Sequence, residues 1–168
     1  MTLWTLWWAC ALSPVPGSRD LPSAAASVTV EAVRPMQIPQ RIGATEQPMV
    51  ITFWATWCGP CVSEQPRLYD WAQAHPEVRT IWVSLDLIRL RTSLVTPHLE
   101  ERGYLRGAVE QWQLEDADPA MAMSRWLPDW QGILPTTVVV SRDGQVLETY
   151  PRALSEADLE EIAQRTQR

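Results

Sequence analysis

Two short apolar runs near the middle of the chain predict buried β-strands. Residues 49–54 and 78–85 are rich in β-branched and aromatic side chains, and the second run presents apolar side chains to both faces, as strands of a parallel sheet do. Between the runs, apolar residues recur every three or four positions until Pro76, which predicts a helix that ends there. The recurring residues are Val62, Leu68, Trp71 and Ala72. A strand, a helix and a strand in this order predict a βαβ unit.

The patterning is weaker on both sides of this unit. Residues 28–33 alternate and predict an outer strand, whereas residues 34–48 contain Pro35, Pro39 and Pro48 and predict a connecting loop. After the unit we expect residues 86–130 to form an inserted, partly irregular segment. Its predicted pieces are a helix over residues 97–102 ending at Gly103, a strand over 105–112, an acidic turn at 115–119 and a helical turn over 121–126.

The C-terminal part returns to strong patterning. Two β-rich runs within residues 132–150 flank Arg142-Asp143-Gly144, and an Asp-Gly pair in this setting predicts a β-hairpin. Ser155 then opens a capped amphipathic helix. Its apolar side carries Leu154, Leu159, Ile162 and Ala163.

Length and charge limit the possible functions. The 168 residues suffice for one domain with a full core, which we place at residues 28–168. The 20 acidic residues outnumber the 14 basic ones, all of which are arginine, so a nucleic acid is not expected as a partner.

Residues 1–27 are interpreted as a leader rather than as part of the fold. A continuous apolar run at 3–12 is too short to span a bilayer but is typical of the core of a secretory signal. Cleavage after Ala11 or Ala26 is the first interpretation, although no lysine or arginine precedes the run. An N-terminal anchor, lipidation at Cys10 and an uncleaved hydrophobic tail are the alternatives. We therefore expect a periplasmic or other extracytoplasmic location.

Cys58 and Cys61, the two cysteines outside the leader, carry the expected chemistry. They lie where the first predicted strand passes into the helix, and a helix N-terminus offers unpaired N–H groups and partial positive charge that favour a thiolate. A free cysteine titrates near ~8.5, and such sites lower that value. We predict that Cys58 is the attacking sulfur and that Cys61 resolves the mixed disulfide. Pro60 suits the first helical turn because its missing N–H would have no helical partner.

The motif at residues 57–61, Trp-Cys-Gly-Pro-Cys, and the later Leu134-Pro135-Thr136 before the hairpin give the chain a clear resemblance. Over residues 49–165 it resembles the thioredoxin superfamily. Residues 53–58 and 64–66 are most similar to the exported TlpA-like thiol-disulfide oxidoreductases, which include reductases serving cytochrome c maturation.

The resemblance implies a fold and a set of partners. The fold is a thioredoxin-like α/β domain, with a central mixed β-sheet flanked by helices and an insertion over the substrate face before the cis-proline hairpin. The implied function is reduction of protein disulfides, with protein thiols and disulfides as substrates and a membrane-bound electron donor. No cofactor is implied, and we expect a monomer.

The resemblance also implies a substrate-binding set around the cysteines. Pro135 is expected to be a cis-proline that faces the two sulfurs and exposes the Leu134 backbone, with which an extended substrate can pair as an added strand. A trans proline that merely starts a strand is the alternative. Trp57 is expected to be an exposed apolar wall, whereas other tryptophans fill the core. The full set is Trp57, Gly59, Pro60, Leu134, Pro135 and Thr136.

Two departures from thioredoxin itself narrow the mechanism. Thr52 stands where thioredoxin has a buried aspartate, so the proton of Cys61 needs another acceptor. Glu64 lies three residues after Cys61 on the same helical face and matches the glutamate of TlpA-like reductases. If it is partly buried, its raised pKa suits a base. A solvated helix glutamate is the alternative.

A metal-binding or copper-delivery module is the main rival function. One Cys-x-x-Cys pair supplies two ligands where a structural zinc site needs four, and His75 and His98 show no matching spacing. No histidine lies near Pro135, where a copper-delivery role would require one, and Val62 stands where covalent haem attachment requires histidine. We therefore predict no metal site, and we rank a redox-inactive interaction domain lower still because both thiols are present.

Overall fold

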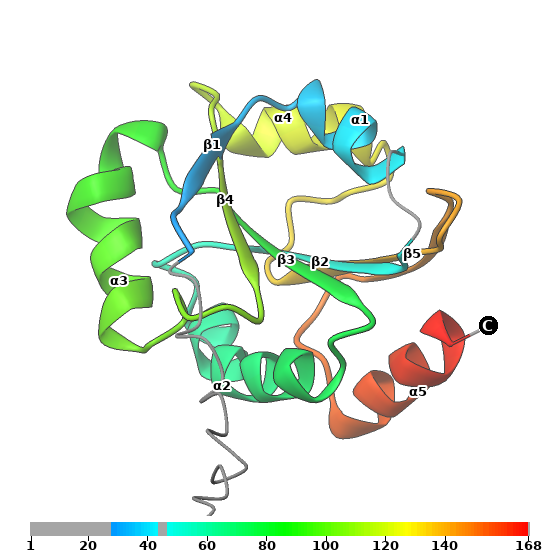
Figure 1. The fold of residues 1–168 in the computed structure, drawn as a ribbon. Helices are drawn as coiled ribbons and strands as arrows, with labels where there is room; N and C mark the ends of the chain where they lie inside the picture. Colours follow the sequence, from blue (N-terminus) through cyan, green and yellow to red (C-terminus); the bar gives the residue numbers. More distant parts are fainter. Residues whose placement is uncertain (1–27, 44–46, 168) are drawn as a thin grey trace, which may run out of the picture.

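The computed structural model describes residues 28–43 and 47–167, so the predicted leader lies outside the described residues. The described chain forms a six-stranded mixed sheet in the order β1-β4-β3-β2-β5-β6 (Figure 1). Strands β1 to β4 run parallel to one another, whereas β5 is antiparallel to both β2 and β6. The strands are β1 (Glu31–Val33), β2 (Met49–Trp54), β3 (Arg79–Ser84), β4 (Glu110–Leu114), β5 (Thr136–Val140) and β6 (Val146–Tyr150).

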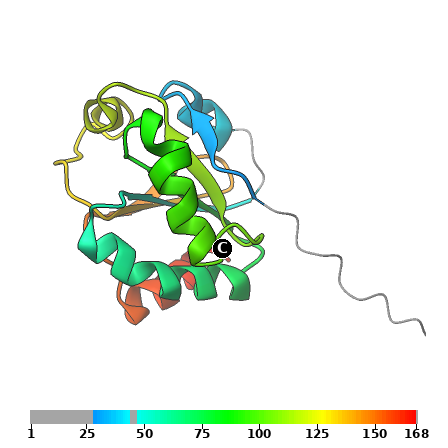
Figure 2. The same cartoon turned by 90° about the vertical axis from the view of Figure 1, so that its left-hand side faces the viewer.

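Helices cover both faces of this sheet. Helices α1 and α4 lie on one face and α2 and α5 on the other, while α3 stands beside α2 near the β1 edge (Figures 1 and 2). A 3₁₀ turn at Ile88–Leu90 and a π turn at Arg91–Val95 lead into α3. The helices are α1 (Gln37–Gly43), α2 (Gly59–Ala74), α3 (Thr96–Glu101), α4 (Pro119–Trp126) and α5 (Glu156–Thr166).

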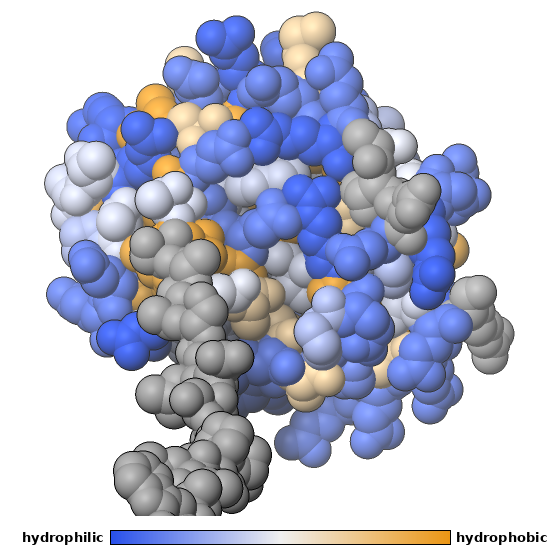
Figure 3. Space-filling view, in the orientation of Figure 1, coloured by the Kyte–Doolittle hydropathy of each residue, from blue (hydrophilic) through white to orange (hydrophobic). Residues whose placement is uncertain are grey.

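Alternate residues of the sheet build two cores. Val50, Trp54 and Trp82 pack with α2, α3 and α5, and Cys58 and Cys61 belong to this cluster. Ile51 and Phe53, their neighbours on the other face, pack with α1 and α4. Because each face is buried, the register of β2 is fixed, and the strand delivers Cys58 to one defined end of the sheet. The face shown in Figure 3 is mainly hydrophilic, with apolar side chains in small patches.

The strongest sequence patterns are confirmed. The first predicted strand is β2, the second contains β3, and the helix between them ends at Ala74 with His75 as its C-cap. The predicted hairpin is β5 and β6, with Gly144 at a φ of 82° in the turn between them. Gly103 ends the helical stretch at α3 with a φ of 75°, a conformation that glycine adopts without a Cβ clash.

The prediction of a loop over residues 34–48 is wrong, because α1 occupies Gln37–Gly43. Pro39 is tolerated since it is the third helical residue, where a backbone N–H has no helical acceptor. Ile38 and Ile42 stand four positions apart and are buried against the sheet. This spacing was the signal that the prolines obscured.

The segment at 86–130 is more ordered than predicted. Its strand β4 begins at Glu110 rather than at residue 105 and enters the sheet between β1 and β3, while α4 packs on the face that also carries α1. Gly107 has a φ of 102°, which is incompatible with a regular strand through residues 105–109. The outer strand, predicted over residues 28–33, is likewise shorter, because β1 spans only Glu31–Val33.

The final helix begins with a reciprocal cap. The Ser155 side chain accepts a hydrogen bond from the Asp158 N–H at 3.2 Å, while the Asp158 carboxylate accepts one from the Ser155 N–H at 2.7 Å. Bonds from Arg152, together with those from Ser155, hold the pKa of Asp158 well below its usual range. The cap thus fixes where α5 starts, directly after Leu154, which is buried against α2.

Removing this cap tests its contribution to folding. We expect Ser155→Ala to lower the free energy of unfolding by about 1 kcal/mol, the usual cost of losing a helix N-cap. Urea denaturation of the oxidised protein measures the change. Ser63→Ala, on the exposed side of α2, is the control, and an equal effect of the two substitutions would contradict this role of the cap.

Candidate functional site

The two cysteines form a disulfide at the first turn of α2, directly beyond the carboxyl end of β2. Cys58 is the N-cap residue, and its sulfur accepts a hydrogen bond from the Cys61 N–H at 3.3 Å. Their Cα atoms are 5.3 Å apart. Both residues are buried, with an exposed fraction of 5% for Cys58 and 1% for Cys61, so Cys58 is the one nearer to solvent, as predicted.

The surroundings of Cys58 favour its ionised form once the disulfide is reduced. The Cys61 N–H is one of the N-terminal donors without a helical acceptor, and it points at the sulfur that would carry the negative charge. No side-chain cation is required for this effect. Gly59 and Pro60 are exposed beside the sulfur, and Trp57 is 71% exposed. The surface at this end of the molecule therefore presents backbone and one large aromatic ring.

The proline turn lies beside the cysteine loop. The Leu134–Pro135 bond is cis, as predicted. Thr136 pairs with Phe53 in the antiparallel ladder of β5 and β2, so the residues before Thr136 lie beside those that follow Phe53. Leu134 is partly buried and packs against the cluster that contains both cysteines. The register thus brings together the two motifs that are 73 positions apart at Cys61 and Leu134.

Glu64 is buried one turn beyond Cys61, which excludes the alternative of a solvated helix glutamate. Its Oε2 atom accepts a hydrogen bond from the Leu154 N–H at 2.9 Å, while Oε1 is buried without a hydrogen-bond partner. Burial raises the pKa of Glu64 to about 7, against the opposing effects of the Leu154 N–H and the Arg67 guanidinium. A carboxyl with this pKa is suited to exchange a proton at neutral pH.

Arg67 also binds the backbone of Leu154. Its guanidinium donates a hydrogen bond to the Leu154 carbonyl, whereas Glu64 accepts one from the Leu154 N–H. Two side chains of α2 therefore hold the backbone of Leu154 on both sides. This gives Glu64 a packing role in addition to its predicted chemical one, and any test of Glu64 has to separate the two.

Position 52 bears out the predicted departure from thioredoxin. Thr52 is buried, and its hydroxyl lies 3.1 Å from that of Thr137 on β5. The two hydroxyls satisfy each other across the sheet, so this position supplies hydrogen bonding rather than a carboxylate.

A buried aspartate that sequence analysis missed anchors the loop before Cys58. Asp86 follows β3 and accepts hydrogen bonds from the Thr56 N–H at 2.9 Å and the Thr56 hydroxyl at 2.7 Å. The Ser84 hydroxyl also donates to it at 2.9 Å, and the Gln113 amide donates to its carbonyl at 3.0 Å. The carboxyl ends of neighbouring parallel strands lie at the same edge of a sheet. This rule could have indicated that Asp86, after β3, lies close to Thr56, after β2.

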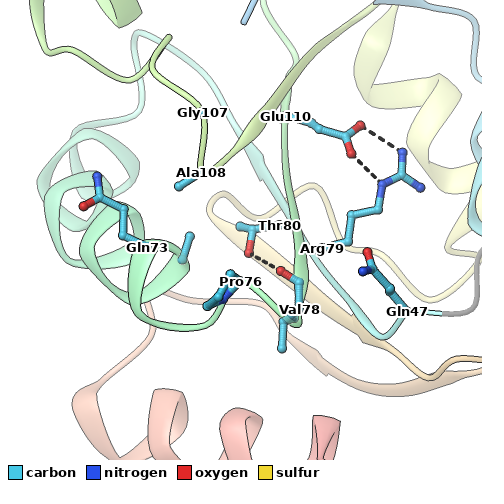
Figure 4. A pocket seen from close by; sticks show the side chains of 10 residues that line it. Gln47, Gln73, Pro76, Val78, Arg79, Thr80, Gly107, Ala108 and Glu110 are labelled. Atoms are coloured by element: carbon cyan, nitrogen blue, oxygen red, sulfur yellow. Dashed lines mark hydrogen bonds and ion pairs between the residues drawn. The ribbon is translucent and has the colours of Figure 1, made fainter. Parts of the chain in front are cut away.

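The other hollows of the described chain lack comparable chemistry. One of about 380 Å³ lies at the opposite end of the sheet, at the start of β3 and β4 (Figure 4). Its polar feature is the ion pair in which Arg79 donates to Glu110 at 2.6 and 2.9 Å. Across residues 28–43 and 47–167, no three His, Cys, Asp or Glu side chains are grouped as a metal site would need. Within the same ranges, no helix is long and apolar enough to cross a bilayer.

Sequence comparisons connect this geometry to known proteins. Residues 29–94 match the family model described as Thioredoxin. The chain is 50% identical over 38 residues to mitochondrial thioredoxin-3 of Saccharomyces cerevisiae, covering 23% of this chain and 30% of that protein. It is 30% identical over 69 residues to thioredoxin-2 of Pyricularia oryzae, covering 41% and 40% respectively. The chain thus spans less than half the length of either relative.

Solved structures extend the likeness to most of the domain. A thioredoxin-related protein from Neisseria meningitidis serogroup B superposes with a TM-score of 0.58 at 23% identity, covering 71% of this chain and 84% of that one. A putative thiol:disulfide interchange protein DsbE from Chlorobium tepidum gives 0.54 at 23% identity, covering 72% and 78%. At these identities the likeness concerns the fold. Together with the family match over residues 29–94, it shows that the described chain has a thioredoxin-like fold.

The raised pKa of Glu64 predicts a pH dependence of stability. Between about pH 4.5, its ordinary value, and about pH 7, the folded state keeps a proton that the unfolded state releases, so stability falls as pH rises through this window. The Glu64→Gln variant should not lose stability in this way, because glutamine has no titrating proton. We expect the free energy of unfolding of the wild type, relative to this variant, to fall by roughly 1–3 kcal/mol across the window.

Urea denaturation of the oxidised proteins at a series of pH values checks this expectation. Glu160→Gln, at an exposed position of α5, is the matched control. A difference between wild type and Glu64→Gln that stays constant with pH would mean that Glu64 is not held protonated by burial.

The Asp86 anchor predicts coupled stability effects. We expect Asp86→Asn to lower the free energy of unfolding by about 1–3 kcal/mol, because it weakens hydrogen bonds to a carboxylate. In a double-mutant cycle with Thr56→Val, the interaction energy should exceed about 0.5 kcal/mol. Asp70→Asn, exposed on α2, is the control. Additive effects of the Asp86 and Thr56 substitutions would show that the anchor does not hold the loop.

Proposed function

We propose that this protein is a thiol-disulfide oxidoreductase that reduces disulfides of other proteins. The observation that carries the proposal is the position of Cys58, an accessible N-cap sulfur that accepts the Cys61 N–H and lies beside the cis-proline turn. The family match and the thioredoxin fold support the same class of reaction.

The proposed reaction starts from the reduced dithiol. The Cys58 thiolate attacks one sulfur of a client disulfide, forming a Cys58–client disulfide and releasing the other client sulfur as a thiolate that takes up a proton. Cys61 then loses its proton to Glu64 and attacks the Cys58 sulfur. This step closes the Cys58–Cys61 disulfide and releases the second client thiolate. Two electrons have passed to the client, and a thiol donor must return two to the protein.

The substrate-binding set completes this scheme. The Leu134 backbone, at the turn before Pro135, pairs with an extended client segment, and Thr136 fixes this turn to the sheet by pairing with Phe53. Trp57 provides apolar contact on the other side of the sulfur. Gly59 and Pro60 leave the approach to Cys58 free of large side chains.

The cellular setting follows from the sequence. We place the protein outside the cytoplasm, exported by its leader, active as a monomer and recharged by a membrane-bound donor. The TlpA-like similarity at residues 53–58 and 64–66 supports roles in cytochrome c maturation or in envelope redox homeostasis. Neighbours of similar fold include a secreted disulfide oxidoreductase of Mycobacterium tuberculosis, at 19% identity and a TM-score of 0.53.

Cysteine variants test the proposed reaction. We expect the wild type to reduce insulin with dithiothreitol as donor and Cys58→Ser to lose at least about 100-fold in rate over background, because the attacking sulfur is gone. Cys61→Ser should accumulate a covalent conjugate with a client that mass spectrometry detects and that dithiothreitol releases. A reduction potential close to the ~−270 mV of thioredoxin would support the reducing direction.

Two outcomes would reject the proposal. A conjugate that forms equally with Cys58→Ser would show that Cys58 is not the attacking sulfur. A potential near the ~−120 mV of a strong oxidant would reverse the direction of electron flow. Stoichiometric retention of Cu(I) without turnover would favour the metal-binding alternative instead.

A further inference from the structure

A second hollow adjoins the proline turn on the α4 side of the sheet. It measures about 490 Å³ and lies between the loop that follows α4 and strand β6. Trp126, Leu127 and Trp130 form one side, and Val146 and Thr149 of β6 form the other. Its volume falls within the ~300–1,000 Å³ range of sites that hold small ligands. None of the proposed reaction steps uses this hollow.

The two tryptophan walls are held in place by the rest of the fold. The Trp126 ring packs 5.5 Å from the ring of Phe53, which belongs to the core of β2. The Trp130 indole N–H donates to the Ile133 carbonyl at 3.0 Å and to the Thr136 hydroxyl at 3.1 Å. Since both rings are anchored, the hollow exists before any ligand arrives, which lowers the ordering cost of binding.

The same bonds connect the hollow to the cis-proline turn. Ile133 and Thr136 flank Leu134 and Pro135, so one side chain, Trp130, both lines the hollow and braces the turn. On the other side, Thr137 pairs with Tyr150, which places the next residue, Pro151, beside Thr136. Pro151 also lines the hollow. A segment that pairs with Leu134 therefore passes the rim of the hollow.

The lining indicates what the hollow would bind. Its walls are mainly aromatic and aliphatic, and Asp129 is its one charged lining residue. Asp129 is exposed and makes no ion pair within the described ranges. An apolar side chain next to a basic residue complements such a site in both shape and charge.

We propose that this hollow is a client-specificity pocket, which receives an apolar side chain of an extended client segment while a neighbouring basic residue of that client pairs with Asp129. This inference rests on the proposed function for its choice of occupant. It adds a preference among clients that the Leu134 backbone alone does not give, because backbone pairing is indifferent to side chains.

Two adjacent residues of β6 provide a matched test. Val146 lines the hollow and is 48% exposed, whereas Leu147 is 40% exposed and does not line it. Val146→Asp places a charge in the apolar lining that also contains Asp129, and Leu147→Asp adds the same charge outside the lining. Circular dichroism and thermal unfolding establish that both variants are folded.

The first measurement is binding without chemistry. Fluorescein-labelled ten-residue peptides carry serine in place of the client cysteine and a Phe-Arg pair two to six positions away on either side. We expect at least one spacing to bind the oxidised protein at least tenfold more tightly than the same peptide with Phe replaced by Ser, as measured by fluorescence anisotropy. Val146→Asp should weaken this binding at least fivefold, and Leu147→Asp less than twofold.

Charge reversal tests the role of Asp129 in the same assay. Asp129→Arg should weaken binding of the Phe-Arg peptide and strengthen binding of a Phe-Glu peptide, so that the order of the two affinities is reversed. Equal effects of Val146→Asp and Leu147→Asp, or binding that does not depend on Phe, would overturn the pocket. A wild-type dimer that Val146→Asp disrupts in sedimentation would also overturn it, since a second copy would then occupy the hollow.

The second measurement is turnover by the reduced protein. The substrates are the best peptide with its cysteine restored as a glutathione mixed disulfide, and dithiobis(nitrobenzoate), a disulfide too small to extend from Cys58 into the hollow. Val146→Asp should lower kcat/KM for the peptide at least fivefold more than for the small disulfide. Phe-dependent binding without turnover of either disulfide would reject the redox function and leave the pocket standing.

Discussion

The hydrogen bond from the Cys61 N–H to the Cys58 sulfur is the interaction on which the chemistry of this molecule depends. It exists because β2 ends at Trp54 and the chain turns into α2 within four residues, with Cys58 as N-cap. The first turn of a helix always has unpaired donors, and here a sulfur takes the place of the usual capping oxygen. In the proposed reaction, this backbone donor is what stabilises the Cys58 thiolate.

The rest of the architecture keeps that turn in place. Core packing on both faces of the sheet determines the register of β2, and β5 pairs with it so that the proline turn lies next to the cysteines. Asp86, at the end of β3, holds Thr56 from the other side. Three strands therefore contribute to the site at the same end of the sheet, while the hollow at the opposite end contains a structural ion pair.

Local chemistry made part of this structure predictable from sequence. The β2–α2–β3 unit, the Asp-Gly hairpin and the cap of α5 each have a signal confined to a few neighbouring residues. The cis state of Pro135 was anticipated through the family resemblance, whereas the burial of Glu64 was one of two open alternatives that the structure decides. Helix α1 was not, because its three flanking and internal prolines outweighed the two isoleucines that bury it. The start of β4 was misplaced because the predicted strand ran through Gly107, whose φ of 102° does not fit a regular strand.

Contacts between distant residues were beyond the reach of sequence patterns. Asp86 resembles an ordinary loop aspartate until the sheet places it 2.9 Å from the Thr56 N–H, 30 positions away. The link from Trp130 to Thr136 is shorter in sequence, yet it needs the conformation of the whole loop to form. Such contacts depend on register and packing, which no single stretch of sequence encodes.

The hydrogen bonds between α2 and Leu154 also limit how far the C-terminal end of the chain can be truncated. Glu64 and Arg67 bind the N–H and carbonyl of a residue that directly precedes α5. Displacing Leu154 from α2, for example by a truncation that ends before it, would open this buried carboxyl to water and return its proton affinity toward that of an ordinary glutamate. The backbone that leads into the last helix therefore takes part in setting the proton affinity of a carboxyl that lies next to the cysteine turn, although it carries no titratable group of its own.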